Sequence, residues 1–264
     1  MEIISGRELQ PRFIETARVR FGDVDRSDRL SPGSIFNFFQ EAAISHAEHL
    51  GVGRDAMVKT GQAWVLSRVS IFIEKRPAYE ELIEVSTWPR GWEKLFAFRD
   101  YTIRDANGFA SVRGRGSWLV LDIEKRRPLR VQSMMEALPI NDGHDAMSKN
   151  PPGLEIRDNL QKVAERSASY SDVDYYGHMN NARYVQWIQD AADIDILTSA
   201  DQIRLDINYL NEVKPKDNVE LWAAPIKSTE NEADYPSNRG SAFAFEGRRE
   251  SQAVFRAELF TGKI

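Results

Sequence analysis

Asp174 and His178 place a carboxylate and an imidazole four positions apart, directly before a segment with helical periodicity. A carboxylate there can orient a water molecule, and an imidazole that titrates near neutral pH can polarise the carboxylate or the water. Gly177 permits close approach of a ligand, and backbone N–H groups at the start of a helix can stabilise a developing oxyanion. These residue types are therefore candidates for acid–base chemistry.

This segment is the second copy of an internal repeat. Residues 21–43 (FGDVDRSDRLSPGSIFNFFQEAA) align without a gap on residues 170–192 (YSDVDYYGHMNNARYVQWIQDAA). In both copies the apolar residues recur at helical spacing, which predicts one apolar stripe on each of two helices. The polar part differs, because Ser27, Asp28 and Arg29 stand where the second copy has Tyr176, Gly177 and His178. We therefore expect the second copy to carry the chemistry and the first to support it.

Each candidate residue also has a structural interpretation. Asp174 can cap the helix, and because Asp25 holds the same place in the first copy, part of the role of Asp174 is expected to be structural. A glycine before a helix is often a plain turn, and a lone histidine is more often hydrogen-bonded in a structural role. The replacement of His178 by Arg29 in the first copy favours a catalytic interpretation of the histidine.

Antiparallel strands are predicted after each helix. The segments 64–88 and 202–222 combine strand alternation with a Pro-containing turn. Residues 95–122 and 241–262 are predicted to be long β-rich segments, the first with an Asn-Gly turn. We therefore expect an α+β protein in which each half is a central helix wrapped by an antiparallel sheet, with the two sheets joined across a pseudo-twofold axis.

Composition excludes several functional classes. A formal net charge of −5 argues against nucleic acid as the main partner, which would need a clustered basic surface. The absence of cysteine excludes disulfides, thiolate metal sites and a cysteine nucleophile, and it fits a reducing cytosol. The histidines form no recognisable metal set, so we expect no metal or other cofactor. Because the N-terminal residues lack signal-peptide features and no apolar run suits a membrane helix, we expect a soluble cytoplasmic protein.

Two motifs and the tandem arrangement resemble a known family. The motifs are SDVDYYGHMNNARYVQWI in the second copy and WVLSRVSIFIEKRPAYEELIEVSTWPRG after the first helix. Over residues 14–262 the chain is similar to the acyl-acyl carrier protein (acyl-ACP) thioesterases, which are built from two hot-dog folds in one chain. The resemblance implies an N-terminal hot-dog that binds the acyl chain (1–138), a linker (139–165) and a catalytic C-terminal hot-dog (166–264).

The resemblance also assigns roles to residues. It implies that Asp174 is the catalytic aspartate and that Glu212, before the turn of its strand motif, is the catalytic acidic residue. The alternative for Glu212 is an ordinary charge at a strand end, like Glu74 in the first half. Tyr176 departs from plant-type members, which have Asn there. Three alternatives stay open. The Tyr176 hydroxyl donates the hydrogen bond in place of the amide, or Tyr176 lines the site without chemistry, or backbone N–H groups or Asn180 take over the role of the amide. In the first two cases Asn180 is a residue at the start of the helix.

The implied reaction is hydrolysis of a fatty acyl-ACP thioester to free fatty acid and holo-ACP, without metal or nucleotide. By resemblance, Phe36, Phe39 and Trp64 would line an acyl-chain tunnel, although core packing is the more common role for any one of them. ACP is an acidic partner, so the basic stretch 124–130 is a candidate docking surface. An acyl-CoA thioesterase and a non-catalytic acyl-binding module stay open. Two hot-dogs in one chain already form the usual pair, which favours a monomer or a homodimer.

Overall fold

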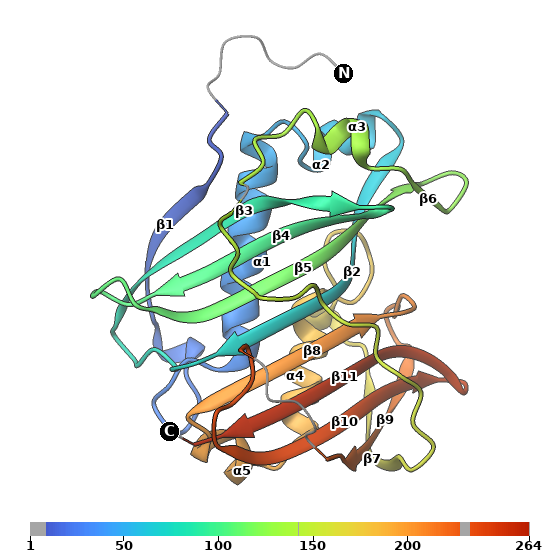
Figure 1. Cartoon of the computed structure of the whole chain (residues 1–264). Coiled ribbons are helices and arrows are strands. Elements are labelled where there is room, and N and C mark those ends of the chain that lie inside the picture. Colours follow the sequence, from blue (N-terminus) through green and yellow to red (C-terminus); the bar gives the residue numbers. More distant parts are fainter. Residues whose placement is uncertain (1–8, 142, 228–232, 264) are drawn as a thin grey trace.

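Figure 1 shows the computed structural model of the chain, which describes residues 9–141, 143–227 and 233–263. One antiparallel sheet of 11 strands runs through the whole molecule, and its two longest helices contact each other against one face of it. Each half is a helix packed against antiparallel strands, which confirms the predicted α+β class. Residues 1–8, where no signal peptide is expected, lie outside the described residues.

The elements of the second half repeat the order of the first half, except that β6 and α3 have no counterpart among its described residues. The first half contains β1 (Phe13–Arg18), η1 (Phe21–Asp23), α1 (Pro32–His49), α2 (Arg54–Lys59), β2 (Gln62–Ile73), β3 (Leu82–Glu93), β4 (Phe96–Arg104), β5 (Ala110–Asp122), β6 (Arg127–Leu129) and α3 (Gln132–Met135). The second half contains β7 (Gln161–Ser167), η2 (Tyr170–Asp172), α4 (Asn181–Ala191), α5 (Ile194–Ser199), β8 (Gln202–Tyr209), β9 (Asn218–Pro225), β10 (Arg239–Arg249) and β11 (Gln252–Gly262). In the described part of the chain, no helix combines the length and apolarity needed to cross a membrane.

A central pair of strands joins the halves. The strand order is β1-β3-β4-β5-β2-β8-β11-β10-β9-β7, with β6 beside β5. β2 and β8 are antiparallel, and their register runs from Arg68 opposite Asn208 to Ile73 opposite Ile203. Because the hydrogen-bonded ladder continues across this pair, the two sheets form one continuous surface.

The helices α1 and α4 meet where α1 begins. Ser31 caps α1 by accepting the backbone N–H of Ser34, and Gly33 in the first turn donates its N–H to the side chain of Gln189 over 3.1 Å. A Cβ atom at Gly33 would lie 2.8 Å from the side chain of Gln186, so only glycine allows this close approach. The apolar stripes predicted from the repeat are buried in one core cluster that spans both halves.

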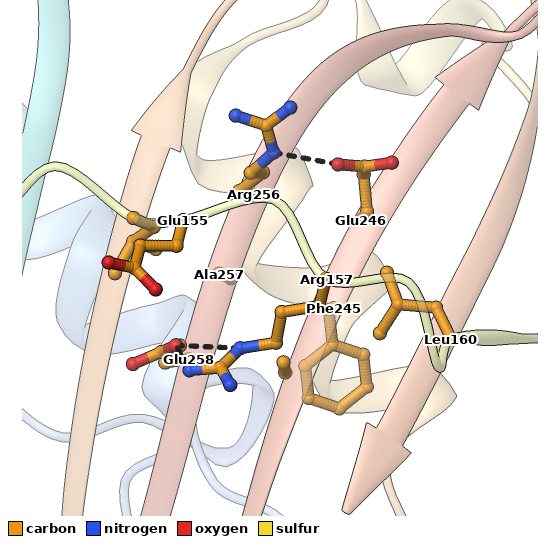
Figure 2. A pocket seen from close by; sticks show the side chains of 10 residues that line it. Glu155, Arg157, Leu160, Phe245, Glu246, Arg256, Ala257 and Glu258 are labelled. Carbon is orange, nitrogen blue, oxygen red and sulfur yellow. Dashed lines mark hydrogen bonds and ion pairs between the residues drawn. The ribbon is translucent and has the colours of Figure 1, made fainter. Parts of the chain in front are cut away.

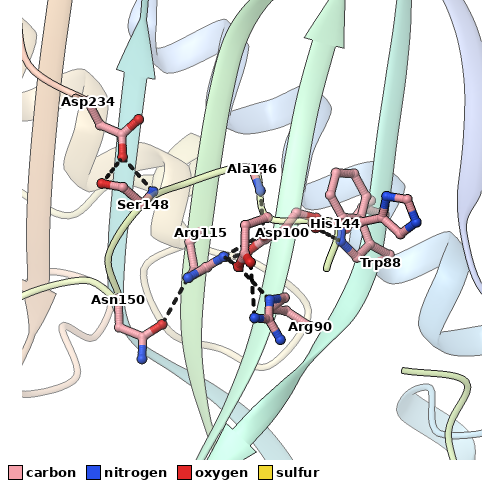
Figure 3. A network of polar contacts seen from close by, with 11 residues as sticks. Trp88, Arg90, Asp100, Arg115, His144, Ala146, Ser148, Asn150 and Asp234 are labelled. Carbon is pink, nitrogen blue, oxygen red and sulfur yellow. Dashed lines mark hydrogen bonds and ion pairs between the residues drawn. The ribbon is translucent and has the colours of Figure 1, made fainter. Parts of the chain in front are cut away.

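A buried polar network holds the connecting segment (residues 143–160) against the face of the sheet opposite the long helices (Figures 1 and 3). Arg115 on β5 donates to both carboxylate oxygens of Asp100 on β4, over 2.6 and 2.7 Å, and both residues are buried. Asp100 also accepts the backbone N–H of Ala146 at 2.7 Å. Strand β7 begins at Gln161, inside the range 139–165 expected as a linker. The segment therefore packs as a part of the fold.

A small cavity lies under the same segment in the second half (Figure 2). It holds about 210 Å³ of empty space, including its opening, between residues 154–160 and the strands β10 and β11. Two ion pairs border it: Arg157 contacts Glu258 at 2.5 Å, and Arg256 contacts Glu246 at 2.7 Å. The first pair fastens the connecting segment to β11.

Candidate active site

A tight turn precedes α4 and carries two of the candidate catalytic residues. The backbone N–H of Asp174 donates to the carbonyl of His178, and the N–H of Gly177 donates to the carbonyl of Asp174, each over 3.0 Å. The Asp174 Oδ1 atom accepts the N–H of Tyr176 at 2.9 Å. Gly177 has a φ of 80°, a left-handed conformation that favours glycine. The turn therefore uses one carboxylate oxygen of Asp174, and no hydrogen bond within the described residues uses Oδ2.

The third candidate reaches this turn from the end of β8. His178 Nε2 lies 3.3 Å from Glu212 Oε2, and the two side chains are 36% and 56% exposed. The backbone at Glu212 is fixed on one side by Arg249, which donates to its carbonyl at 3.0 Å. Tertiary structure thus brings Asp174, His178 and Glu212 together at a solvent-accessible edge, where an imidazole oriented by a carboxylate can exchange protons with water.

The first half has the same turn with different side-chain partners. Both the N–H and the hydroxyl of Ser27 donate to Asp25 Oδ1, over 2.8 and 2.5 Å. Arg76, whose side chain is only 4% exposed, donates to Asp25 Oδ2 at 2.5 Å. Burial opposes ionisation of Asp25, but the hydrogen bonds from Ser27 and Arg76 outweigh it and hold its pKa below the ordinary value. Both oxygens of this carboxylate are therefore occupied.

Backbone hydrogen bonds correct the sequence alignment of the strand ends. Leu30, two positions before α1, donates its N–H to the carbonyl of Pro77 over 2.8 Å. Met179, two positions before α4, donates its N–H to the carbonyl of Val213, also over 2.8 Å. This makes Arg76 the counterpart of Glu212, in place of Glu74. At this position the first half therefore carries a positive charge and the second half a negative one. A gapless alignment of the strand motifs pairs Glu212 with Glu74 and does not show this difference.

Aromatic side chains from the turn contact the first half. The rings of Tyr175 and Tyr176 lie 4.2 Å apart, and both residues are about half exposed. Arg54 on α2 places its guanidinium 4.3 Å from the centre of the Tyr175 ring and 5.9 Å from that of Tyr176. This geometry is a cation–π contact. Tyr176, which sequence analysis left with several roles, is therefore packed in an aromatic cluster on the surface.

The other two positioning residues, Asn180 and Gly177, form hydrogen bonds with backbone groups. Asn180 is the N-cap of α4, and its side-chain oxygen accepts the N–H of Ala182 at 2.8 Å. Gly177 uses its own N–H inside the turn, so it cannot also donate to a substrate oxyanion. The N–H of His178 has no backbone partner among the described residues. The N–H of His178 and the start of α4 are thus the donors left for an oxyanion.

A pocket between the halves lies beside the start of α4. It contains about 310 Å³ of empty space, including its mouth. The lining residues come from α1, β2, β4, β5 and α4: Phe36, Phe39, Gln40, Leu66, Val69, Tyr101, Trp118 and Asn181. Of the three residues predicted to contact an acyl chain, Phe36 and Phe39 are in this lining. Trp64 is not, because it packs against a separate cluster and donates its indole N–H to the carbonyl of Val52 at 2.9 Å.

Sequence reasoning missed the polar members of this lining. Tyr101 and Trp118 lie on different strands, and only the sheet register brings them to the same pocket. No local motif marks either residue. Among the described residues, no group of three or more histidine, aspartate or glutamate side chains is arranged to hold a metal ion.

Comparison with known proteins identifies the family. The family model for the acyl-ACP thioesterase N-terminal domain matches residues 11–138, and the model for the C-terminal domain matches residues 157–246. The chain is 25% identical over 220 residues to a chloroplastic palmitoyl-acyl carrier protein thioesterase of Arabidopsis thaliana, covering 76% of this chain and 52% of the relative. It is 26% identical over 237 residues to oleoyl-acyl carrier protein thioesterase 2 of the same plant, covering 81% and 62%. The chain thus spans about half the length of the first of these relatives, and somewhat more of the second.

Solved structures show the same fold. An acyl-ACP thioesterase from Bacteroides thetaiotaomicron superposes with a TM-score of 0.82 at 23% identity, covering 95% of this chain and 98% of that one. A 12:0-ACP thioesterase from Umbellularia californica superposes with a TM-score of 0.79 at 19% identity, covering 96% and 95%. The tandem hot-dog prediction is therefore confirmed. With both domain models matched in order along one continuous sheet, this chain belongs to the acyl-ACP thioesterase family.

Proposed function

We propose that this protein hydrolyses fatty acyl-ACP thioesters to free fatty acid and holo-ACP. The observation that carries the proposal is the contact of His178 with Glu212 beside the partly free carboxylate of Asp174. In the first half, the matching carboxylate is closed off by a buried arginine. Membership of the family, and relatives named as palmitoyl- and oleoyl-ACP thioesterases, support the choice of substrate.

In the proposed reaction, Glu212 orients His178 and stabilises its protonated form. Water attacks the thioester carbon and passes a proton to the imidazole, while the free oxygen of Asp174 helps to orient that water. The backbone N–H of His178 and the N-terminus of α4 stabilise the tetrahedral oxyanion. When the C–S bond breaks, the imidazole returns the proton to the departing thiolate. No covalent acyl-enzyme is needed in this scheme.

We further propose that the first half binds the acyl chain. The pocket lined by Phe36 and Phe39 is built almost entirely from elements of that half, and Asn181 brings it to the start of the helix that follows the candidate catalytic turn. A chain entering here would lie between the halves with its thioester near His178. In this proposal the first half binds the acyl chain and the second half carries the chemistry. The turn of the first half therefore keeps its shape but needs no His–Glu pair of its own.

The test is free-thiol release from ACP and CoA thioesters that share the same acyl chains. Glu212→Ala should lower turnover by on the order of 10²–10⁴-fold, the usual contribution of a positioned acid–base group. Glu74→Ala is the matched control, because it removes a carboxylate from a strand end in the first half. The salt bridge between Glu74 and Arg113 is long, at 3.4 Å, and partly exposed. Equal rates for wild type and Glu212→Ala would refute the proposal, and faster release from CoA would favour the acyl-CoA alternative.

A docking surface for ACP is proposed on the hairpin between β5 and β6. Arg126, Arg127 and Arg130 are exposed there, and their charge complements an acidic carrier. Arg127→Glu should raise KM for acyl-ACP and leave KM for acyl-CoA unchanged; an equal effect on both would argue against carrier docking. We also propose a cytoplasmic location; the absence of cysteine is compatible with a reducing compartment but leaves the compartment open. Cell fractionation tests it, since the plant relatives are named as chloroplastic.

A further inference from the structure

The pocket between the halves combines a mainly apolar lining with a few polar groups. Four of its lining residues carry hydrogen-bonding groups: Gln40 on α1, Tyr101 on β4, Trp118 on β5 and Asn181 at the start of α4. A saturated acyl chain can satisfy none of these groups. Buried polar groups are nearly always hydrogen-bonded, so the buried indole N–H of Trp118 favours an occupant with an acceptor atom.

The Trp118 indole acts on the Tyr101 hydroxyl and lowers its pKa, but the two groups do not form a hydrogen bond of normal geometry. The indole Nε1 of Trp118 is buried and has no hydrogen-bond partner among the described residues. No hydrogen bond within the same residues uses the side-chain amide of Gln40 or of Asn181. Burial outweighs this effect and raises the pKa of Tyr101 to about 12, so its hydroxyl keeps its proton near neutral pH. An acceptor entering the pocket would therefore meet several unused donors.

Close packing fixes where these groups point. A Cβ atom at Gly116 would lie 2.8 Å from Trp118 Nε1, so glycine at this place on β5 gives the indole its room. The ring of Phe39 stacks on Tyr101, with ring centres 4.8 Å apart. Gly114 lies two residues before Gly116 on β5, and glycine is needed there because a Cβ atom would lie 2.8 Å from Phe39. The polar groups are held by the packing of α1 against the sheet, which suits selective recognition.

We propose that this pocket selects acyl chains that carry an oxygen near the thioester end, as in 3-hydroxyacyl and 3-oxoacyl thioesters. The oxygen is placed near the thioester end because Asn181, which lines the pocket, is the first residue of the helix that follows the candidate catalytic turn. Both a hydroxyl and a ketone oxygen accept hydrogen bonds from the indole N–H, which is only a donor. This inference rests on the proposed thioesterase function and adds the class of acyl chain to it.

The test compares kcat/KM for three ACP thioesters of equal chain length: saturated, 3-hydroxy and 3-oxo. The wild type should prefer an oxygenated chain, and Trp118→Phe should reduce that preference by roughly five- to tenfold, the effect of one hydrogen bond. The preference is read as the ratio of kcat/KM for the oxygenated and saturated substrates, so a general loss of activity in the variant does not count. Trp222→Phe is the matched control, because it removes an indole N–H in the second half that donates to Glu220 instead. Tyr101→Phe gives a second, independent removal of a donor.

Two results would overturn the inference. One is a wild type that turns over the saturated chain as well as the oxygenated ones; the other is a preference that Trp118→Phe and Tyr101→Phe leave intact. Either would mean that water satisfies the donors. If the wild type releases no thiol from any substrate, the proposed function fails instead. The selectivity is then read from calorimetric binding of 3-hydroxy and saturated free fatty acids, where equal affinities would refute it.

Discussion

Replacing Asp174 and Asp25 by asparagine, one at a time, separates the two roles that the same turn has in the two halves. In Asp174→Asn the amide oxygen can still accept the N–H of Tyr176, so the turn keeps its hydrogen bond. We expect a change in the free energy of unfolding within about 0.5 kcal/mol, as for most surface substitutions. Turnover should fall by on the order of 10²–10⁴-fold, because the charge that orients water is gone.

In Asp25→Asn the effects should be reversed. The amide oxygen can keep the bonds from Ser27, but an N–H group replaces the oxygen that accepts from Arg76 at 2.5 Å. The Arg76 side chain is 4% exposed and the Asp25 side chain 21%, so a nearly buried guanidinium loses its charged partner. The loss of one charge-assisted hydrogen bond predicts a destabilisation of about 1.5–3 kcal/mol. Turnover should stay at the wild-type level.

Urea unfolding and thiol release, both measured on both variants, check this crossed pattern. Because the pKa of Asp25 is depressed in the folded state, the stability that its ion pair supplies is present above the ordinary value of 3.8 and is lost as pH falls through the folded pKa. If Asp174→Asn keeps the wild-type turnover, Asp174 only forms the turn, as Asp25 does in the first half. Unchanged stability in Asp25→Asn would show that the buried pair contributes nothing.

Three further predictions concern stability. Gly177→Val should cost about 1–2 kcal/mol because φ is 80°, whereas Gly177→Asp should cost less, since Asp28 holds the matching position at a φ of 61°; urea midpoints compare them. His46 is buried beside Arg99, and desolvation lowers its pKa to about 4. The unfolded chain takes up its proton below 6.5, so stability should fall between pH 6.5 and 4 by up to about 1.4 kcal/mol per pH unit, and His46→Gln should flatten this slope. Asp100→Leu removes the buried carboxylate partner of Arg115, which keeps only the partly exposed Asp145 as a charged partner, and should cost about 3 kcal/mol in calorimetry, a loss that a further Arg115→Met exchange should partly recover.

Local patterns were enough to predict the elements and the family. The helices follow from apolar spacing at 32–49 and 181–191, because this pattern depends on residues close together in the chain. The expectation that Asp174 caps its helix was wrong: Asn180 is the cap, and Asp174 accepts an N–H group within the preceding turn. The resemblance to acyl-ACP thioesterases is confirmed by both domain models. Asp174 and His178 belong to one turn, so their proximity was also readable from their spacing.

Contacts between distant segments were decided only by the tertiary structure. Glu212 reaches His178 because β8 ends beside the turn, and the same pairing makes Arg76 its counterpart in the first half. The polar lining of the pocket, including Tyr101 and Trp118, depends on the register of β4 and β5 and on the packing of α1 over them. A shift of one residue would turn each side chain to the other face of the sheet, and no local signal in the sequence sets that register.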